Sequence, residues 1–381
     1  MLRRIAKVFI GRLKALKTKL FYLNKRGRLT SLWAVKNDVT FQKYCFFVEE
    51  NRNIKYTVDF CELPLLKERH KWVGAQAIGD KVYAIPNDAS SILCYNAKNR
   101  QISFEGKLQE GLFKWTGGCV WNEKIYAFPR SSDRLLGFEP NTRQISFYQT
   151  GQSYQGEHHY GGVCTEDGRI YQPPRDSDHI LVWDLNLENS RKICLAPAWC
   201  KLRLRYCGSI IHPNGFAYFF PEQKGRVIKM DLQTEEWCLI GQMIDTITFD
   251  AKVAADGNIY GFSARRAGIM KINVTTDSVE MIHTEMNAGA YGTKLGLNGK
   301  LYSIAGNGQF VWEYDPCLDE IKKLYDTECI MQAKYAGGMT RQNGVIMAMP
   351  ARGNELCMMM PDKELQDIPE DIYMRFWNDC Y

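Results

Sequence analysis

The sequence predicts an all-β fold, a seven-bladed β-propeller built from four-stranded blades of about 44 residues. Three observations support this prediction. A pattern of short apolar runs recurs from residue 72 to residue 360. Turn dipeptides such as Asn-Gly and Asp-Gly separate the runs inside each copy. No run between copies has the length and periodicity of a crossover helix, which excludes a parallel α/β fold.

The second apolar run of each copy carries an aromatic residue that marks the period. The markers are Tyr83, Tyr126, Tyr171, Tyr218, Tyr260, Tyr302 and, as a substitution, Met347. Their spacings are 43, 45, 47, 42, 42 and 45 residues. Inside each run the apolar residues alternate with a period of two, as expected for strands, and seven copies of one blade unit predict a closed ring.

The two ends of the repeat region predict how the ring closes. The seventh copy reaches residue 361 without an obvious fourth strand, whereas residues 51–60 have the pattern of one. We expect residues 51–60 to pair with the last blade, because an open ring would leave sheet edges without partners. The apolar run 43–48 competes with residues 356–360 for the place beside this strand, and the sequence leaves both alternatives open.

Three regions follow from this assignment. Residues 38–360 form the propeller, with its repeating blades starting at residue 72. Residues 361–381 are acidic and then aromatic, and we expect this tail to dock on the outside of the propeller as a helix. Residues 1–37 form a basic arm.

The basic arm has the pattern of an amphipathic helix. Eleven of the 49 Lys and Arg residues lie in it and none of the 43 acidic residues, so the arm carries +11 and the rest of the chain −5. Its apolar residues fall on one helical face: Leu2, Ile5, Phe9, Leu13, Leu16, Leu20 and Leu23. We expect residues 1–30 to bind an anionic membrane surface, where each base adds about 1 kcal/mol. Packing on the body or on a partner protein, and a role as a targeting peptide or nucleic-acid arm, are the alternatives.

Composition predicts the compartment. The chain has 13 cysteines, an odd number, and several lie inside apolar runs, so we expect reduced thiols and a cytoplasmic protein that is peripheral to the inner membrane face. No run of about 18 apolar residues lacks a charge, which argues against a transmembrane helix. The acidic body argues against specific binding to nucleic acid.

The repeat also resembles known propeller families. The clearest copy has Tyr160-Gly161-Gly162, then Asp167-Gly168-Arg169-Ile170-Tyr171, then Ile180-Leu181-Val182-Trp183-Asp184. This order is similar to that of the seven-bladed propeller superfamily, in particular of kelch-like and streptogramin-lyase repeats, and the likeness covers roughly residues 40–360. The resemblance implies the architecture. It implies lyase activity only weakly, because propellers host enzymes, lectins and scaffolds alike. Streptogramin lyases use His and Glu side chains with a metal at the mouth. Where their repeat often carries Glu after the second strand, this chain has Pro86, Pro129, Pro174, Pro221 and Pro350.

Aromatic residues near the glycine that opens each copy predict a ligand site. They form a column of seven: Trp72, Trp115, Tyr160, Tyr206, Phe249, Tyr291 and Tyr335. Basic residues or histidine precede five of them: Lys71, Lys114, His159, Arg205 and Lys334. Further arginines follow the second strands of four copies: Arg130, Arg175, Arg265 and Arg352. Together they predict an aromatic funnel with a basic rim, suited to a sugar or nucleotide that carries phosphate, sulfate or carboxylate. Packing between blades is the alternative for the aromatic residues, and a solvated rim is the alternative for the bases.

Signals for catalysis and for metal binding are few. Glu157, His158 and His159 are the only candidates for an acid and base at the mouth, with polar surface as the alternative. The six histidines lack zinc spacing, no CxxC pair occurs, and phosphate-loop motifs are absent, so we expect neither a metal nor a cofactor.

The sequence therefore favours a non-enzymatic binding module that presents its funnel to an anionic sugar or glycan, or to a protein partner. An enzyme of lyase, hydrolase or transferase type acting at the same mouth is the second hypothesis. A structural adaptor, with the aromatic residues confined to the core, is the third.

Overall fold

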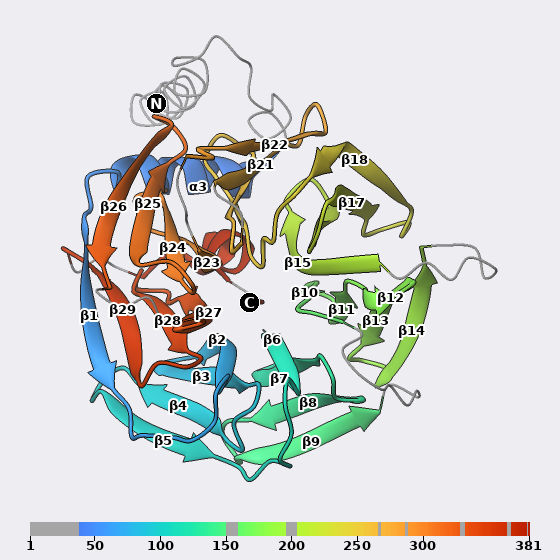
Figure 1. Ribbon diagram of the computed structural model, residues 1–381, viewed down its shortest axis with the longest axis vertical. Coiled ribbons are helices and arrows are strands. Elements are labelled where there is room, and N and C mark those ends of the chain that lie inside the picture. Colours follow the sequence, from blue (N-terminus) through green and yellow to red (C-terminus); the bar gives the residue numbers. More distant parts are fainter. Residues whose placement is uncertain are drawn as a thin grey trace, which may run out of the picture.

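The chain folds into seven antiparallel sheets around a central channel, as the computed structural model shows (Figure 1). The described residues are 38–149, 159–195, 204–265, 268–285, 289–327, 332–363, 367–378 and 380–381. The predicted fold class is confirmed. The basic arm and its predicted membrane contact lie outside the described residues, so they stay predictions. Within the described segments, no helix is long and apolar enough to cross a membrane.

Each blade has four strands, counted here from the channel outward. Blade one comprises β2 (Trp72–Ile78), β3 (Lys81–Pro86), β4 (Ile92–Asn96) and β5 (Gln101–Glu105). Blade two comprises β6 (Trp115–Trp121), β7 (Lys124–Pro129), β8 (Arg134–Glu139) and β9 (Gln144–Gln149). Blade three comprises β10 (Val163–Cys164), β11 (Arg169–Gln172), β13 (His179–Asp184) and β14 (Asn189–Cys194). Blade four comprises β15 (Leu204–His212), β16 (Phe216–Pro221), β17 (Gly225–Asp231) and β18 (Trp237–Ile244), and the short β12 (Arg175–Ser177) pairs with β15.

The remaining blades follow the same order. Blade five comprises β19 (Lys252–Val253), β20 (Ile259–Phe262), β21 (Ile269–Asn273) and β22 (Ser278–Ile282). Blade six comprises β23 (Ala290–Leu295), β24 (Leu301–Ala305), β25 (Phe310–Asp315) and β26 (Glu320–Asp326). Blade seven takes β27 (Tyr335–Thr340), β28 (Ile346–Pro350) and β29 (Glu355–Pro361) from the end of the repeats, and its outer strand is β1 (Tyr56–Glu62).

The ring closes through an N-terminal strand as predicted, but the strand is Tyr56–Glu62 rather than residues 51–60, because residues 51–53 form the turn that follows α3. β1 pairs with β29 along its whole length, from Tyr56 opposite Pro361 to Glu62 opposite Glu355. Residues 356–360 therefore take the third position of blade seven. The Tyr56 hydroxyl ties the closure to the neighbouring turns, because it donates to the Gly344 carbonyl oxygen at 2.9 Å and accepts from the Leu297 N–H at 3.0 Å.

The competing strand assignment for residues 43–48 is wrong, because they lie in the helix α3 (Val39–Glu50). The Asp38 carboxylate caps this helix by accepting from the Phe41 N–H at 3.0 Å. One face buries Phe41, Tyr44, Cys45 and Val48, whose spacings of three, one and three residues match a helix rather than a strand.

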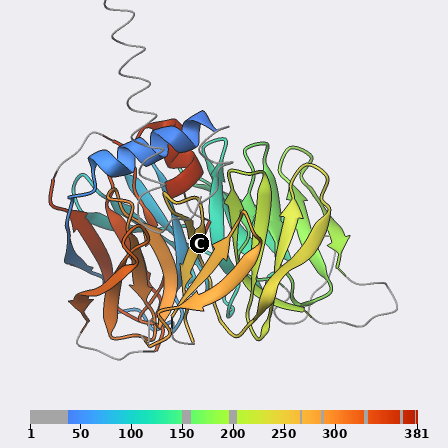
Figure 2. The same cartoon turned by 90° about the horizontal axis from the view of Figure 1, so that it is seen from above.

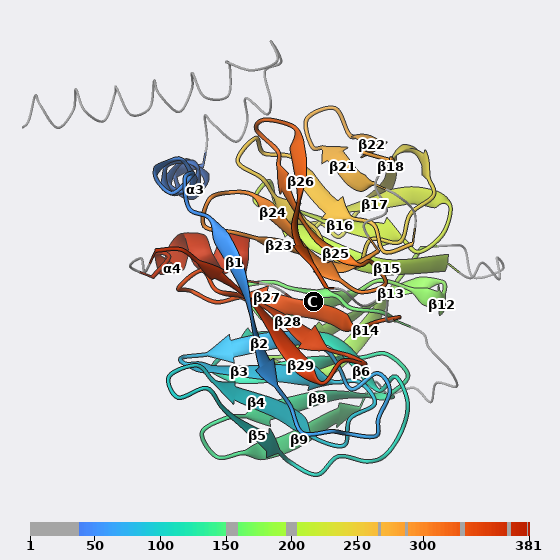
Figure 3. The same ribbon diagram turned by 60° about the vertical axis from the view of Figure 1, so that its left-hand side comes forward.

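The C-terminal tail packs against α3 on one face of the propeller (Figures 2 and 3). It forms α4 (Glu370–Ile372) and the π-helical turn η1 (Tyr373–Trp377). Tyr44 stacks on Phe376 with ring centroids 4.2 Å apart, and its hydroxyl donates to the Val253 carbonyl oxygen at 3.0 Å. The helices therefore cover the face formed by the turns between first and second strands. Beyond η1 the tail does not stay outside, because Cys380 and Tyr381 lie in the central channel, where Figure 1 marks the C-terminus.

Candidate functional site

The candidate site is the mouth of the channel on the face opposite α3. Here the links that enter the first strands and the loops after the second strands come together. We use "mouth" for His70, Arg130, Tyr160, Arg175, Tyr291 and Arg352 with the loops that carry them. Tyr381 reaches the inner side of the mouth from the channel, since its hydroxyl lies 3.1 Å from that of Tyr160.

Four of the seven aromatic residues of the predicted column pack inside their blades. The indole N–H of Trp72 donates to the Ser91 carbonyl oxygen at 3.0 Å, and its ring stacks on Phe104 of the outer strand. Trp115 repeats this arrangement with Phe147 in blade two. The Tyr206 hydroxyl donates to the carbonyl oxygen of Arg226, and that of Tyr335 donates to Glu355. These four rings are buried and face the blade interior.

The other three aromatic residues face the channel. The rings of Tyr160 and Phe249 lie 5.2 Å apart, and those of Phe249 and Tyr291 also lie 5.2 Å apart. Strand pairing explains the difference, because Pro86 lies opposite Trp72 but Pro174 lies opposite His159, one residue before Tyr160. In blade six the paired residue is Ala290, again one residue before the aromatic. A shift of one residue moves a side chain to the other face of a strand.

The spacing to glycine could have revealed this shift from the sequence. Trp72, Trp115, Tyr206 and Tyr335 stand two residues before the first glycine of their strand, whereas Tyr160 and Tyr291 stand one residue before it. The seven aromatic residues therefore do not occupy one structural position, and only Tyr160, Phe249 and Tyr291 lie at the channel.

Two of the predicted basic residues tie neighbouring blades together. The Lys114 ammonium donates to the carbonyl oxygens of Asp88 and Ala89, both at 3.0 Å, in blade one. The Lys71 ammonium lies 3.4 Å from the carbonyl oxygen of Arg352 in blade seven. Both residues are buried, and burial lowers the pKa of each ammonium. Lys334 pairs with Glu355 at 3.1 Å in its own blade.

Arg175 and Arg205 form an ion-pair network at the edge of the mouth. Arg175 binds Glu222 through two nitrogens, at 3.0 and 2.6 Å. Arg205 donates to Asp176 at 3.2 Å. The two carboxylates therefore satisfy much of the charge that the sequence assigned to ligand binding. Arg265 is exposed in the loop between β20 and β21.

Arg130 and Arg352 lie closer to the channel axis. The Arg130 guanidinium stacks on Tyr160 and on Phe113, with its central carbon 4.6 and 4.3 Å from the two ring centroids. Arg352 donates to His70 Nε2 at 3.0 Å. Burial lowers the pKa of His70, and the nearby charges of Arg352 and Arg130 lower it further against the opposing effect of Asp88, so the imidazole is neutral at pH 7. The His70 ring lies 5.6 Å from the Phe113 ring on which Arg130 stacks, so Arg130 and Arg352 belong to one connected group of side chains.

The candidate catalytic residues are only partly described. Glu157 and His158 lie outside the described residues. His159 is 2% exposed, its Nδ1 lies 3.1 Å from the Pro173 carbonyl oxygen, and its ring packs edge-on against His179. Its catalytic role therefore stays an untested prediction. Among the described residues, no group of three or more His, Cys, Asp and Glu side chains has the arrangement of a metal site.

A buried charged cluster beneath the mouth was not predicted. Lys252 and Lys294 lie on adjacent innermost strands, 4% and 0% exposed, and Asp250 stands beside them. The Lys294 ammonium binds the Asp250 carboxylate at 2.5 Å and the Tyr381 carbonyl oxygen at 2.7 Å. Burial lowers the pKa of Lys252 to about 7. The sequence signal was a lysine inside the first apolar run of blades five and six, opposite the aromatic marker.

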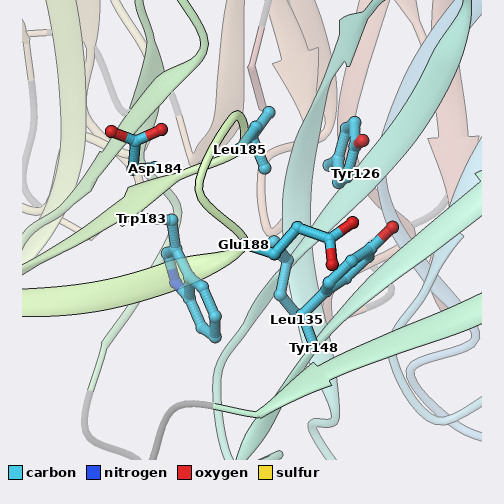
Figure 4. Close-up of a pocket in the computed structure, with 7 residues that line it drawn as sticks. All are labelled: Tyr126, Leu135, Tyr148, Trp183, Asp184, Leu185 and Glu188. Carbon is cyan, nitrogen blue, oxygen red and sulfur yellow. The ribbon is translucent and has the colours of Figure 1, made fainter.

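A separate hollow lies between blades two and three, away from the mouth (Figure 4). Tyr126, Leu135 and Tyr148 line it from blade two, and the segment from Trp183 to Glu188 lines it from blade three. Most of these side chains belong to the core between the blades, so the hollow offers little room for a ligand.

Comparison with known proteins gives the fold but no family. No protein-family model and no curated protein matches the chain. Among solved structures, a catalytically inactive virginiamycin B lyase from Staphylococcus aureus with quinupristin has a TM-score of 0.66 at 12% identity, covering 80% of this chain and 99% of that one. A streptogramin B lyase structure has a TM-score of 0.65 at 12% identity, with 80% and 98% coverage. The extracellular domain of a proposed hybrid two-component system from B. thetaiotaomicron has a TM-score of 0.58 at 12% identity, with 80% and 42% coverage.

These likenesses confirm a streptogramin-lyase-like propeller at the level of fold. At 12% identity they carry no activity to this chain. The neighbours include both a lyase and the extracellular domain of a two-component system. The kelch-like resemblance remains a prediction.

Proposed function

We propose that this propeller is a binding module whose mouth holds an anionic, ring-bearing ligand of the class of sugar phosphates, sugar nucleotides and acidic glycans. The observation that carries the proposal is the state of Arg352. This half-buried guanidinium donates to the neutral His70 imidazole, and its Nε is buried without a hydrogen-bond partner. Among the described carboxylates, none lies within salt-bridge distance of Arg352.

A guanidinium in this state favours an anionic ligand. It has five N–H donors in a fixed planar fork, and it binds phosphate or carboxylate through two of them. A neutral imidazole accepts one hydrogen bond but supplies no opposite charge. The positive charge of Arg130 lies in the same environment, acting on the pKa of His70 and of Tyr291 as Arg352 does. An anion bound by the Arg352 guanidinium would compensate the charge of that residue, which has no carboxylate within salt-bridge distance among the described residues.

Aromatic surface at the mouth supports a ring-shaped ligand body. Phe249 and Tyr291 both keep part of their surface exposed, as does Phe113 beneath Arg130. Sugar rings and bases stack on such faces while charged groups at the rim fix their orientation. A protein partner with an acidic segment is the alternative occupant. The predicted cytoplasmic location and the contact of residues 1–30 with an anionic membrane remain proposals from the sequence.

The test is a thermal-melt titration of the full chain with glucose 1-phosphate, UDP-glucose, glucuronate and inorganic phosphate. A probe at about 100 times its Kd adds about 2.7 kcal/mol and raises Tm by roughly 2 °C or more. Arg352→Gln removes a charge-assisted contact and should weaken binding about 10- to 100-fold. Arg143→Gln is the matched control, because Arg143 is 70% exposed on the outer edge of the propeller.

The outcomes separate the alternatives. A Tm shift that Arg352→Gln removes and Arg143→Gln retains supports the proposal. Equal binding by both variants would place the anion elsewhere and refute the role of the mouth. No shift with any probe would refute small-anion binding and favour the docking of a protein.

A further inference from the structure

Residues Cys380 and Tyr381 fill the central channel like a bound ligand. The Cys380 carbonyl oxygen accepts from the Gly118 N–H at 2.8 Å, and the Tyr381 carbonyl oxygen accepts from the Gly338 N–H at 3.2 Å. Gly118 and Gly338 lie on innermost strands, whose N–H groups on the channel side have no further strand to pair with. The tail therefore supplies hydrogen-bond acceptors for these N–H groups, which in an empty channel would have to donate to water.

The Tyr381 ring contacts a defined set of side chains. It is 4% exposed and stacks on Phe249 with an interplanar angle of 11° and centroids 5.7 Å apart. Its hydroxyl lies 3.1 Å from the Tyr160 hydroxyl, so the two share a hydrogen bond. One ring face and one polar group thus recognise a phenol, and the Lys294 ammonium at 2.7 Å recognises the adjoining carbonyl.

Glycines on three blades make room for the tail backbone. A Cβ on Gly117 would stand 2.3 Å from the Cys380 carbonyl oxygen. A Cβ on Gly74 or Gly337 would stand 3.0 or 3.1 Å from the Tyr381 carbonyl carbon. All three glycines have positive φ, between 63° and 83°. Any other residue at these positions would be strained and would also narrow the channel.

We propose that the channel beneath the mouth is a binding site for an aromatic residue with its backbone carbonyl, and that Tyr381 is the tethered occupant. The class of ligand is a tyrosyl group: a phenol ring stacked on Phe249 with its hydroxyl at that of Tyr160, and a main-chain oxygen facing Lys294 and Gly338. A tyrosine-bearing peptide takes this place when the tail leaves it. This site is separate from the anion site proposed at Arg352, because it requires no negative charge on the ring.

The charges around the site agree with an occupant that brings acceptor oxygens. The Lys252 and Lys294 ammonium groups lie beside the Asp250 carboxylate, and Lys294 also binds the Tyr381 main-chain oxygen at 2.7 Å. An apolar occupant would leave the Lys294 ammonium short of one acceptor in a buried setting, which is costly.

The first experiment ejects the tail without touching its sequence. Gly117→Ala brings a methyl group against Cys380, whereas Gly79→Ala is the matched control, because Gly79 also has positive φ and a Cβ there meets nothing within 4 Å. Cys380 keeps part of its surface exposed, but desolvation and the neighbouring Cys164 raise the pKa of its thiol to about 12. Little thiolate is therefore present at pH 8, and alkylation by iodoacetamide is slow while the tail is seated. Gly117→Ala should speed Cys380 alkylation by about tenfold or more through local opening, and Gly79→Ala should not.

Peptide mapping by mass spectrometry makes this result decisive. Cys207 is fully buried and reports global unfolding, and Cys194 is exposed and reports the activity of the reagent. Faster alkylation of Cys380 alone supports a tail that can leave the site. An unchanged Cys380 rate in Gly117→Ala, or the same increase in Gly79→Ala, would overturn the proposal.

The second experiment removes the Tyr381 side chain and supplies it as a separate small molecule. Tyr381→Ala in the full chain leaves a ring-sized space against Phe249 and beside the Tyr160 hydroxyl. The probe is p-cresol, because it is the tyrosine side chain alone. We expect millimolar p-cresol to raise the Tm of Tyr381→Ala and not that of the wild type, and toluene to raise it less because it lacks the hydroxyl. A folded Tyr381→Ala variant whose Tm does not change with p-cresol, or rises equally with toluene, would contradict recognition of a phenol.

The two proposals fail separately. The p-cresol result does not depend on Arg352, and the phosphate titration does not depend on Tyr381. If Tyr381→Ala does not fold, the alkylation rates of Gly117→Ala and Gly79→Ala still decide whether the tail leaves the channel.

Discussion

Replacing Lys252 by methionine should remove a pH dependence from the stability of the propeller. Lys252 lies on β19 and is 4% exposed. Burial lowers its pKa from 10.5 to about 7, and the neighbouring Lys294 lowers it as well, while Asp250 and Cys380 oppose the shift. The unfolded chain keeps a lysine of ordinary pKa, so the two states bind different numbers of protons between about pH 7 and pH 10.5.

The sign and size follow from this difference. In that window the unfolded state binds more protons, so the free energy of unfolding rises with pH. The full cost of burying the ammonium is about 5 kcal/mol, from 1.36 kcal/mol per pKa unit. It is constant below about pH 7 and vanishes above about pH 10.5. Between pH 7 and pH 9 the free energy of unfolding of the wild type should therefore rise by about 2 kcal/mol through Lys252, and that of Lys252→Met should lack this rise.

Urea unfolding at pH 7, 8 and 9 measures this effect. The quantity to compare is the change of the free energy of unfolding with pH, because the absolute stability of Lys252→Met also reflects the loss of its contacts. Lys98→Met is the control, since Lys98 is 77% exposed and pairs with Asp80 at the surface. Wild type and Lys98→Met should rise together with pH while Lys252→Met stays flatter. Parallel curves for all three proteins would refute the reasoning.

Two further predictions concern the ring and the aromatic column. Tyr56→Phe removes the hydroxyl that bridges two buried backbone groups at the ring closure, so the free energy of unfolding should fall by about 2–4 kcal/mol, measured by urea titration. A loss below about 0.5 kcal/mol would contradict this role. Trp115→Phe removes a hydrogen bond inside blade two and should lower the urea midpoint while leaving the affinity for anionic probes unchanged. A fall in that affinity at unchanged stability would restore Trp115 as a ligand residue.

The blades could be predicted from the sequence because local signals define them. Each hairpin is encoded by alternating apolar residues and by a turn that demands positive φ, as at Gly215 and Gly299. The period of the aromatic markers then sets the number of blades. Ring closure was also predictable, because the last copy lacks one strand and residues 51–60 offer one, although the strand observed is Tyr56–Glu62.

The helix α3 could not be predicted from its own residues. The run 43–48 is apolar at nearly every position, so its helical face appears only once distant partners show which residues are buried. The Tyr44 ring stacks on Phe376 and its hydroxyl donates to the backbone of blade five, and both partners are more than 200 residues away along the chain. The roles of Lys71 and Lys114 were hidden for the same reason, because the carbonyl groups that bind their ammonium groups belong to the neighbouring blade.

The aromatic column shows how a repeat changes function without changing its period. Where proline of the second strand lies opposite the aromatic, as at Trp72 and Pro86, the ring turns into the blade and the residue is structural. Where the aromatic stands one residue later, as at Tyr160 and Tyr291, the pleat turns the ring toward the channel. In blades three and six the aromatic residue therefore lines the site and does not pack in the core of its own blade. Both proposed sites meet at Tyr160, because Arg130 stacks on its ring and Tyr381 lies at its hydroxyl. A single-residue displacement in the repeat is thus sufficient to convert a packing position into the element that joins the mouth to the channel.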